Sequence, residues 1–336
     1  MGYRLSYEAM NKIIKDLSQN YRIYAPKKAV YKGDDTIRYG EISSVEEIVS
    51  DRISGFSPKE AIFPIVQTMM FFNEDICTES EVDSRGIVLL ARACDINGIE
   101  RLDTIFLKNG DEEDFYYKRL REKVKFVLLE CTNDWDTCFC VPMNANRTDN
   151  YQAALRFADG EILACLKDAE LEKYFIGNKT CDYTPGFIEE NQTKIRLPDI
   201  KRGDLGELFK LDYWKELDEK CIGCGKCNMV CITCSCFDTL DVIYKETSRN
   251  GERRRIWSGC MNEEFSTMAG GHNVRRAAGQ RMRFRVFHKI YDFKKRFEGE
   301  NMCVGCGRCS INCIKDISFT EAIGRLVEKT ERRVKI

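Results

Sequence analysis

Two stretches of the chain repeat one spacing of cysteines that is suited to binding iron. They are Cys221, Cys224, Cys227 and Cys231 in the first stretch, and Cys303, Cys306, Cys309 and Cys313 in the second. Both follow the pattern C-x2-C-x2-C-x3-C, which bacterial ferredoxins use to hold [4Fe–4S] clusters. Glycines between the cysteines allow the backbone to approach the cluster sulfides closely. The repeat therefore predicts two [4Fe–4S] clusters in the C-terminal part of the chain.

The fourth cysteine of each motif is expected to bind the cluster of the other motif, as in two-cluster ferredoxins. The first predicted cluster is held by Cys221, Cys224, Cys227 and Cys313, and the second by Cys303, Cys306, Cys309 and Cys231. Ferredoxins have proline after the fourth cysteine, where this chain has Ile232 and Ile314. The proline shapes a turn and is not a ligand, so the prediction is retained. Structural zinc is the alternative, but zinc sites typically use two separated cysteine pairs.

Four further cysteines are candidates for a third site in the N-terminal half. Cys94 and Cys131 each follow directly on a predicted buried strand. If these strands are parallel, both thiols emerge at the same carboxyl edge of a sheet, where α/β proteins place their ligands. Cys138 and Cys140 lie in the loop just beyond. The residues predict a metal or cluster site, with ordinary buried cysteines or zinc as alternatives.

The remaining cysteines and both histidines are predicted to be structural. Cys234 and Cys236 follow the first motif and are expected to pack beside its cluster. The residues without a spacing partner are Cys77, Cys165, Cys181, Cys260, His272 and His288. A basic run extends from Arg275 to Arg296. A solvated helix face is its commonest explanation, and a docking surface or a counter-charge for anionic clusters is the more specific one.

Residues 1–200 are predicted to form an α/β domain. Buried strands are expected at 85–91 and 125–130, with helices at 96–106 and 115–124 between them, which favours a parallel pair with a right-handed crossover. Further helices are expected at 5–17 and 58–72, and two strands at 155–166 around a turn at Asp159 and Gly160.

Residues 201–336 are predicted to form a second, mostly helical domain. Asp204 is expected to cap a helix that buries Phe209, Tyr213 and Leu217, and Ser318 with Glu321 forms a capping box. The 71 residues between the two motifs are too many for a small β-hairpin ferredoxin. The pattern therefore predicts an α-helical ferredoxin domain with two clusters.

Composition and charge exclude several classes of protein. The chain has 336 residues, 43% hydrophobic, and its 53 Lys and Arg nearly balance its 54 Asp and Glu, so neither nucleic acid nor a membrane surface is an expected partner. No signal peptide and no stretch of about 20 apolar residues is present, which predicts a cytoplasmic protein. In a reducing compartment, clustered cysteines among a total of 18 usually bind metal. No nucleotide-binding or nucleophile-elbow motif occurs.

Several short segments resemble a known family from about residue 80 to residue 310. They are Ala93-Cys94-Asp95-Ile96, Cys131 with Thr137-Cys138-Phe139-Cys140, Cys231-Ile232-Thr233-Cys234-Ser235-Cys236-Phe237, Trp257-Ser258-Gly259-Cys260 and Ala269-Gly270-Gly271-His272-Asn273. The chain resembles the iron–sulfur β subunits of cytosolic hydrogenases (sulfhydrogenases) and the iron–sulfur component of anaerobic sulfite reductase. Its length and the basic stretch from Arg281 to Lys289 resemble the sulfite reductase component most. The family commonly has Cys-Pro-Thr-Cys where this chain has Ile232, a departure that touches only a turn.

The resemblance implies a three-subunit complex. In it a flavin subunit oxidises NADH, this chain relays single electrons, and a sirohaem subunit reduces sulfite to sulfide. The resemblance also implies that Cys94, Cys131, Cys138 and Cys140 hold a third cluster, because they stand at family motif positions. A β subunit of a nickel–iron hydrogenase is the alternative within this class. A self-contained reductase and a zinc-stapled assembly protein are alternatives from other classes.

Overall fold

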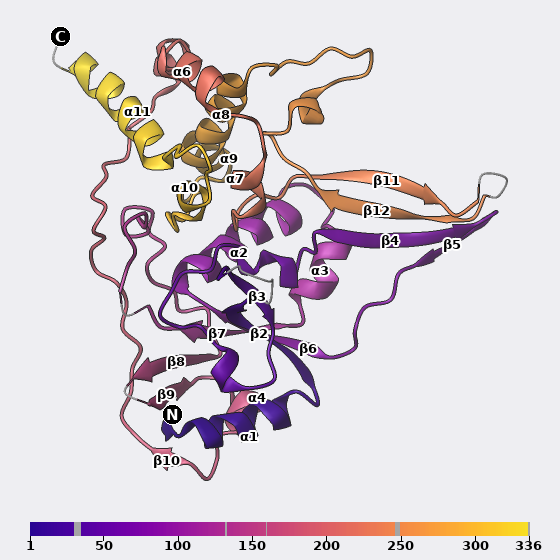
Figure 1. Cartoon of the computed structure of the whole chain (residues 1–336), viewed down its shortest axis with the longest axis vertical. Coiled ribbons are helices and arrows are strands. Elements are labelled where there is room, and N and C mark those ends of the chain that lie inside the picture. Colours follow the sequence, from indigo (N-terminus) through magenta and orange to yellow (C-terminus); the bar gives the residue numbers. More distant parts are fainter. Residues whose placement is uncertain (30–34, 132, 159, 246–248, 335–336) are drawn as a thin grey trace. The chain divides into compact units, whose positions relative to one another are not determined.

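A computed structural model describes the chain except residues 30–34, 132, 159, 246–248 and 335–336 (Figure 1). Two compact units are present, each assembled from stretches that are distant in the sequence. We call the first the sheet unit, and it comprises Met1–Asn133, Arg147–Ile188 and Phe237–Trp257. We call the second the cysteine unit, and it comprises Asp134–Asn146, Glu189–Cys236 and Ser258–Ile336. The predicted division after residue 200 stays a prediction.

The larger sheet of the sheet unit has eight strands among the described residues, in the order β10-β1-β9-β8-β7-β6-β2-β3. Their bounds are β1 Gly2–Leu5, β2 Tyr21–Lys28, β3 Ile37–Glu41, β6 Gly86–Ala91, β7 Val124–Leu129, β8 Ala153–Ala158, β9 Glu161–Leu166 and β10 Lys179–Thr180. The central strands β2, β6, β7 and β8 are parallel, and the outer pairings are antiparallel. This confirms a mixed α/β N-terminal region and the predicted parallel pair at residues 85–91 and 125–130. The predicted turn between β8 and β9 includes Asp159, which lies outside the described residues.

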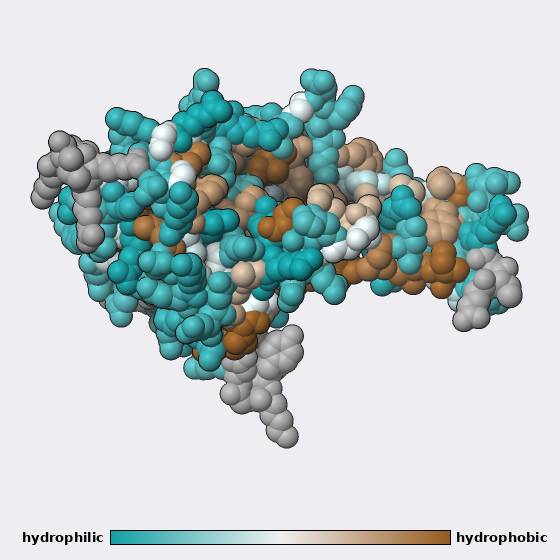
Figure 2. Space-filling view, turned by 90° about the horizontal axis from the view of Figure 1, so that it is seen from above, coloured by the Kyte–Doolittle hydropathy of each residue, from teal (hydrophilic) through white to brown (hydrophobic). Residues whose placement is uncertain are grey.

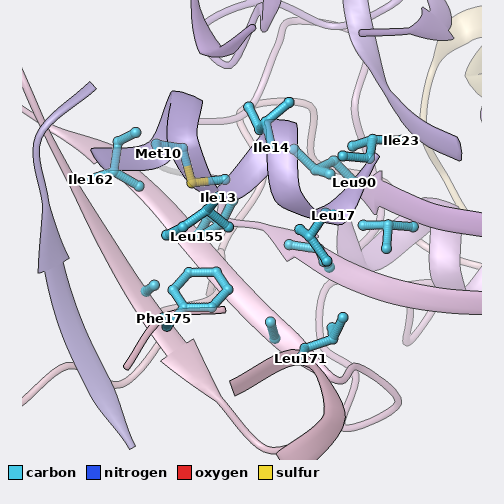
Figure 3. Close-up of a cluster of buried hydrophobic side chains, with 14 of the residues drawn as sticks. Met10, Ile13, Ile14, Leu17, Ile23, Leu90, Leu155, Ile162, Leu171 and Phe175 are labelled. Carbon is cyan, nitrogen blue, oxygen red and sulfur yellow. The ribbon is translucent and has the colours of Figure 1, made fainter. Parts of the chain in front are cut away.

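Helix α1 (Tyr7–Leu17) covers one face of this sheet. The hydroxyl of Ser6 caps it by accepting a hydrogen bond of 3.1 Å from the backbone N–H of Ala9. Its buried side chains recur at helical spacing and meet the sheet in one apolar core, drawn in Figure 3. The labelled members of this core are Met10, Ile13, Ile14, Leu17, Ile23, Leu90, Leu155, Ile162, Leu171 and Phe175.

Helices α2 (Ala93–Leu107) and α3 (Phe115–Arg121) lie on the other side of the sheet from α1 (Figure 1). Strand β6 is buried along nearly its whole length, as expected for a parallel strand that is covered on both faces. The carboxylate of Asp114 caps α3 by accepting a hydrogen bond of 2.7 Å from the N–H of Tyr117. Short helices complete the unit: η1 Val45–Glu47, η2 Pro58–Ala61 and α4 Ala169–Glu172. The helices predicted at 5–17, 96–106 and 115–124 are thus confirmed.

A second sheet of the same unit corrects two expectations. Its strand order is β11-β12-β4-β5, with bounds β4 Val66–Asn73, β5 Ile76–Glu79, β11 Phe237–Ile243 and β12 Gly251–Trp257. The helix predicted at 58–72 is wrong, because its second half is strand β4, whose apolar residues pair with β12 and β5. The mostly helical character expected of 201–336 does not extend to 237–257, where β11 and β12 form a hairpin that belongs to the sheet unit. Figure 2 shows hydrophobic surface along this sheet, and the exposed apolar residues include Phe71, Ile76 and Leu240.

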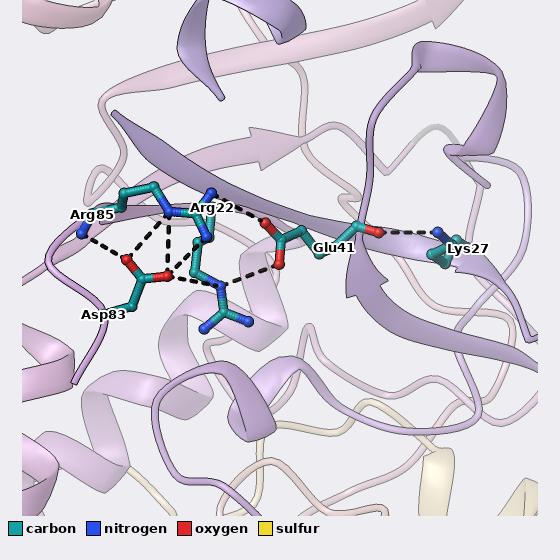
Figure 4. A network of polar contacts seen from close by, with 5 residues as sticks. All are labelled: Arg22, Lys27, Glu41, Asp83 and Arg85. Atoms are coloured by element: carbon teal, nitrogen blue, oxygen red, sulfur yellow. Dashed lines mark hydrogen bonds and ion pairs between the residues drawn. The ribbon is translucent and has the colours of Figure 1, made fainter. Parts of the chain in front are cut away.

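The edge of the larger sheet near β2 and β3 carries a surface network of charged side chains (Figure 4). Arg22 lies 3.2 Å from Glu41 and 3.9 Å from Asp83, and Arg85 lies 2.8 Å from Asp83. The hydrogen bonds from Arg85 lower the pKa of Asp83 to about 2. All four side chains are at least one-third exposed, so solvent screens these pairs and their net stabilisation is small.

The regular elements of the described cysteine unit are helices. They are η3 Arg202–Asp204, α5 Leu205–Leu208, α6 Tyr213–Lys220, α7 Lys226–Met229, η4 Glu263–Ser266, α8 Ala278–Phe287, η5 His288–Asp292, α9 Phe293–Phe297, α10 Arg308–Ile311 and α11 Phe319–Val334. Asp204 does not cap α5 with its side chain, and its carboxylate instead accepts a hydrogen bond of 2.9 Å from the N–H of Lys201. Tyr213 and Leu217 are buried as predicted, whereas Phe209 is 40% exposed. The assignment to an α-helical ferredoxin fold stays a prediction.

No helix in the described part of the chain is long and apolar enough to span a membrane.

Candidate iron–sulfur site

The two cysteine motifs have the same backbone conformation. Gly223 and Gly225 in the first motif have φ of 68° and 70°, and Gly305 and Gly307 in the second have φ of 67° and 73°. The second glycine of each pair precedes a single helical turn, α7 or α10, which carries the third cysteine of its motif. Left-handed φ is readily accessible only to glycine, so these four positions explain why the repeat includes them. The repeated sequence therefore folds as a repeated structure.

Cysteines from both motifs line one cavity in the cysteine unit. Its cysteines are Cys221, Cys224, Cys227, Cys309 and Cys313. Apolar side chains, including Met261, Met282 and Phe319, make up much of the remaining wall, together with the guanidinium of Arg285. Cys313 of the second motif thus lies with three cysteines of the first motif, which is the grouping that crossed ligation requires. The ligation itself stays a prediction.

Cys231, the fourth cysteine of the first motif, is within electrostatic reach of the second motif. Burial raises the pKa of the Cys303 thiol, and the thiols of Cys309 and Cys231 raise it further. A hydrogen bond from Cys234, together with the charges of Lys289 and Arg285, holds the pKa of Cys231 well below its usual value against the effect of burial. A thiol that is biased toward thiolate suits an iron ligand, because the thiolate is the species that binds metal. Cys231 therefore lies where a ligand of the second predicted cluster would lie, and its neighbours favour the thiolate form.

The third cysteine of the first motif is also surrounded by other cysteines. Burial raises the pKa of Cys227 to about 12, while the charge of Arg285 lowers it and the thiols of Cys309, Cys260 and Cys221 raise it. Each of these thiols raises the pKa of its neighbour, so ionising all of them is unfavourable in the absence of a bound cation. Positive iron ions shared among them relieve this repulsion, which is the electrostatic reason that such a set suits a cluster.

The basic run that the sequence shows is partly buried inside the cysteine unit. Arg281, Arg285 and Lys289 are between 3% and 5% exposed. Nη2 of Arg285 donates to the carbonyl oxygen of Cys227 at 3.4 Å, and Nζ of Lys289 donates to the hydroxyl of Thr233 at 2.8 Å. A solvated helix face therefore does not describe these three residues. The alternative of a counter-charge beside the cysteines agrees with where they lie.

Asn228 is a residue of the site that the sequence analysis missed. It lies inside the first motif and is 3% exposed. Its amide nitrogen donates to the sulfurs of Cys234 and Cys260 at 3.4 and 3.5 Å, and its amide oxygen accepts from the N–H of Met261 at 3.1 Å. Asn228 thus holds Cys234 and Cys260 beside the first motif, although neither cysteine is a predicted ligand. Its position between the third and fourth cysteines was the only signal that could have drawn attention to it.

The four N-terminal cysteines are divided between the two units. Cys94 stands in the first turn of α2 just after β6, and Cys131 follows β7, so both lie at the carboxyl ends of neighbouring parallel strands. This confirms the placement on the sheet that was predicted for these two thiols. Cys138 and Cys140 belong to the cysteine unit. The convergence of all four on a third cluster stays a prediction.

Within the cysteine unit, the segment Asp134–Asn146 packs against the loop of the second motif. The N–H of Phe139 donates to the carbonyl oxygen of Gly305 at 2.8 Å, and the sulfur of Cys138 lies 3.7 Å from the carbonyl oxygen of Cys306. The sulfur of Cys140 accepts from the amide of Asn191 at 3.6 Å. Two of the predicted third-site cysteines therefore lie next to the second motif.

Among the described residues, no three His, Cys, Asp or Glu side chains are arranged to hold a single metal ion.

Comparison with known proteins bears directly on the two cysteine motifs. Residues 220–317 match the family model described as a 4Fe-4S dicluster domain. The chain carries a 4Fe-4S dicluster domain. All eight cysteines of the two motifs lie inside this dicluster domain.

A relative aligns with nearly the whole chain. Over 340 aligned residues the chain is 27% identical to "Sulfhydrogenase 2 subunit beta" of Pyrococcus furiosus, and the alignment covers 97% of this chain and 98% of the relative. No solved structure matches. The chain with its dicluster domain is therefore homologous to a sulfhydrogenase β subunit. This comparison supports the hydrogenase β subunit, which was the alternative predicted from the sequence. It does not show the iron–sulfur component of anaerobic sulfite reductase, which was the main prediction.

Proposed function

We propose that this chain is the iron–sulfur electron-transfer subunit of a multi-subunit oxidoreductase of the sulfhydrogenase type. The observation that carries the proposal is the end-to-end alignment with a sulfhydrogenase β subunit, combined with a dicluster domain in which both motifs have the same fold. The name of the relative describes one subunit of a larger assembly, so this chain is expected to act within a complex as well.

The eight motif cysteines would hold two [4Fe–4S] clusters in the crossed arrangement. Cys221, Cys224, Cys227 and Cys313 would bind the first, and Cys303, Cys306, Cys309 and Cys231 the second. Each cluster accepts and donates single electrons when bound, which is the chemistry that this chain's side chains lack. The chain's own part is to exclude water with Met261, Met282 and Phe319 and to supply positive charge from Arg285.

The direction of electron flow and the partners are part of the proposal. A flavin subunit that oxidises NADH would supply electron pairs, and this chain would pass them on singly to a subunit with the terminal catalytic site. In a complex of the sulfhydrogenase type, that terminal subunit would be a nickel–iron hydrogenase, as the resemblance implies. The sirohaem sulfite reductase remains a second candidate, favoured by the resemblance in length and in the stretch from Arg281 to Lys289. A third cluster on Cys94, Cys131, Cys138 and Cys140 would extend the relay, and a cytoplasmic location would agree with these partners.

The test is anaerobic purification of the tagged chain with whatever binds it. We expect about eight iron and eight labile sulfides per chain for two clusters, or about twelve of each with the third. The partners, identified by mass spectrometry, should include a flavoprotein and a hydrogenase. NADH should bleach the cluster absorbance of the complex but not of the isolated chain.

Each alternative predicts a different result. A sirohaem protein in place of the hydrogenase would establish the second candidate. Zinc without iron and sulfide would contradict the proposed clusters and favour the zinc-stapled assembly protein. Rapid bleaching of the isolated chain by NADH would contradict the relay and indicate a nucleotide site on the chain itself.

A further inference from the structure

Three buried cations form a line on one continuous helical segment of the cysteine unit. Helix α8 and the π-helix η5 that continues it carry Arg281, Arg285 and Lys289 at intervals of four residues. Side chains at this spacing share one helix face. All three are buried, with exposed fractions of 5%, 3% and 3%. We call these three residues the cationic stripe.

The stripe lacks the carboxylates that normally accompany buried cations. Among the described residues, no ion pair with Asp or Glu is formed by any of the three. Arg281 donates to the carbonyl oxygens of Arg275 and Arg276, and the Nε atoms of Arg281 and Arg285 are buried without a hydrogen-bond partner in the described structure. A buried charge without a counter-charge is strongly unfavourable. The stripe therefore needs an anion, and no Asp or Glu side chain in the described structure supplies it.

The cysteine motifs are the groups that face the stripe. A Cβ placed on Gly223 of the first motif would lie 3.3 Å from Nη2 of Arg281. Arg285 donates to the Cys227 carbonyl and borders the cavity that contains cysteines of both motifs. Each of these two cations is thus directed toward a loop that is predicted to wrap a cluster.

Lys289 is connected to the second predicted cluster in two ways. Its ammonium donates to the hydroxyl of Thr233 at 2.8 Å, and that hydroxyl lies 3.4 Å from the sulfur of Cys231. Its backbone carbonyl accepts a hydrogen bond of 3.2 Å from the N–H of Cys303. Lys289 is therefore linked to Cys231 by its side chain, through Thr233, and to Cys303 by its backbone carbonyl.

We propose that the cationic stripe is the built-in counter-charge of the two clusters, and that Lys289 selectively raises the reduction potential of the cluster on Cys303, Cys306, Cys309 and Cys231. This rests on the proposed function, since it requires the clusters to be bound. A [4Fe–4S] cluster with four thiolates is anionic and gains one further negative charge on reduction. A fixed neighbouring cation favours the reduced form, because that form carries more negative charge. The stripe thereby helps set the order in which the two clusters fill with electrons.

The test is an anaerobic redox titration of the isolated chain with its clusters, followed by electron paramagnetic resonance. The signals are first assigned with the Cys221→Ser and Cys303→Ser variants. Lys289→Met removes the charge and keeps a side chain of similar length. We expect it to shift the reduction equilibrium of the second cluster at least tenfold toward the oxidised form, which is about 59 mV for one electron. The first cluster should shift less.

Two variants make the result specific to buried charge. Lys294→Met removes an equal charge from an exposed position on the same helical segment and should leave both equilibria unchanged. Lys289→Arg keeps the charge and should restore the potential of the second cluster. If Lys289→Met prevents assembly of the second cluster while Lys289→Arg permits it, the requirement for charge is supported.

Two outcomes would overturn the inference. One is a Lys289→Met protein that holds both clusters and titrates like the Lys294→Met protein. The other is loss of the second cluster in both Lys289 variants, which would show a requirement for lysine's shape and not its charge. Neither outcome depends on a partner subunit. A wild-type chain without iron and sulfide would instead contradict the proposed function.

Discussion

The backbone N–H of Phe139 donates a hydrogen bond of 2.8 Å to the carbonyl oxygen of Gly305. This bond joins the segment that contains Cys138 and Cys140 to the loop of the second cysteine motif. The loop can be approached this closely only because Gly305 has no side chain: a Cβ there would lie 2.3 Å from the carbonyl oxygen of Phe139. The glycine of the motif thus serves the contact with the neighbouring segment as well as the left-handed turn.

Gly305→Ala should weaken both the fold and the second cluster. The residue has a φ of 67°, and the added methyl group would collide with the backbone of Phe139. We expect a loss of roughly 2–4 kcal/mol in the free energy of unfolding, from the strained backbone and the collision together. The measurements are thermal unfolding and iron content. Gly203→Ala is the control, because nothing lies within 4 Å of a Cβ at that position. Equal stability of the two variants would contradict the tight contact.

Cys231→Ser should damage the cluster of the other motif. Cys231 lies within electrostatic reach of Cys303, whereas Cys313 lines the cavity with Cys221, Cys224 and Cys227. We therefore expect the spectrum of the second cluster to change, and Cys313→Ser to change that of the first. Mössbauer and electron paramagnetic resonance spectra of each variant provide the measurement. Cys77→Ser, at an exposed cysteine of β5, is the matched control. Damage by Cys231→Ser that is confined to the first cluster would refute crossed ligation.

Asn228→Leu should destabilise the cysteine unit without removing a ligand. The change leaves the N–H of Met261 without its buried acceptor and removes the amide that contacts the sulfurs of Cys234 and Cys260. An unsatisfied buried donor costs about 1–3 kcal/mol. Chemical denaturation should show this loss, while iron content stays near that of the unmodified protein. Asn73→Leu, at an exposed position in β4, is the control. Complete loss of one cluster would instead show that Asn228 is needed for ligation.

Glu47 should contribute to stability at neutral pH and lose that contribution in acid. Burial opposes its ionisation, but hydrogen bonds from Lys27 and Ser43 lower its pKa from 4.5 to about 2. Because the folded-state pKa lies below the unfolded value, the contribution is present above about pH 4.5 and is lost as the pH falls toward 2. Glu47→Gln should therefore cost about 1–2 kcal/mol at pH 7, after allowance for solvent screening, and less at pH 3.

The free energy of unfolding of the Glu47→Gln protein, measured between pH 3 and pH 7, tests this expectation. Glu112→Gln, at an exposed loop position, should leave the pH profile of stability unchanged. A constant difference between Glu47→Gln and the unmodified protein across this range would contradict the role of the ionised carboxylate.

The amino-acid sequence alone was enough to recognise chemistry that depends on local spacing. The two motifs could be recognised because each places its cysteines and glycines within a few residues, and the family match over 220–317 agrees with that recognition. The parallel pair β6 and β7 could be predicted because a strand that is buried on both faces is a continuous apolar run. Helix α1 could be predicted because its apolar residues recur at helical spacing.

Features that depend on long-range pairing could be identified only in the folded chain. Val66–Asn73 has enough apolar residues for a helix, but its pairing with β12, which is far away in the sequence, makes it a strand. For the same reason 237–257 joins the sheet unit although it lies between the two cysteine motifs. Likewise, the spacing of Arg281, Arg285 and Lys289 could be read in advance, but their burial could not. A charged residue is ordinarily exposed, and only the packing of α8 and η5 against the cysteine loops makes these three the exception.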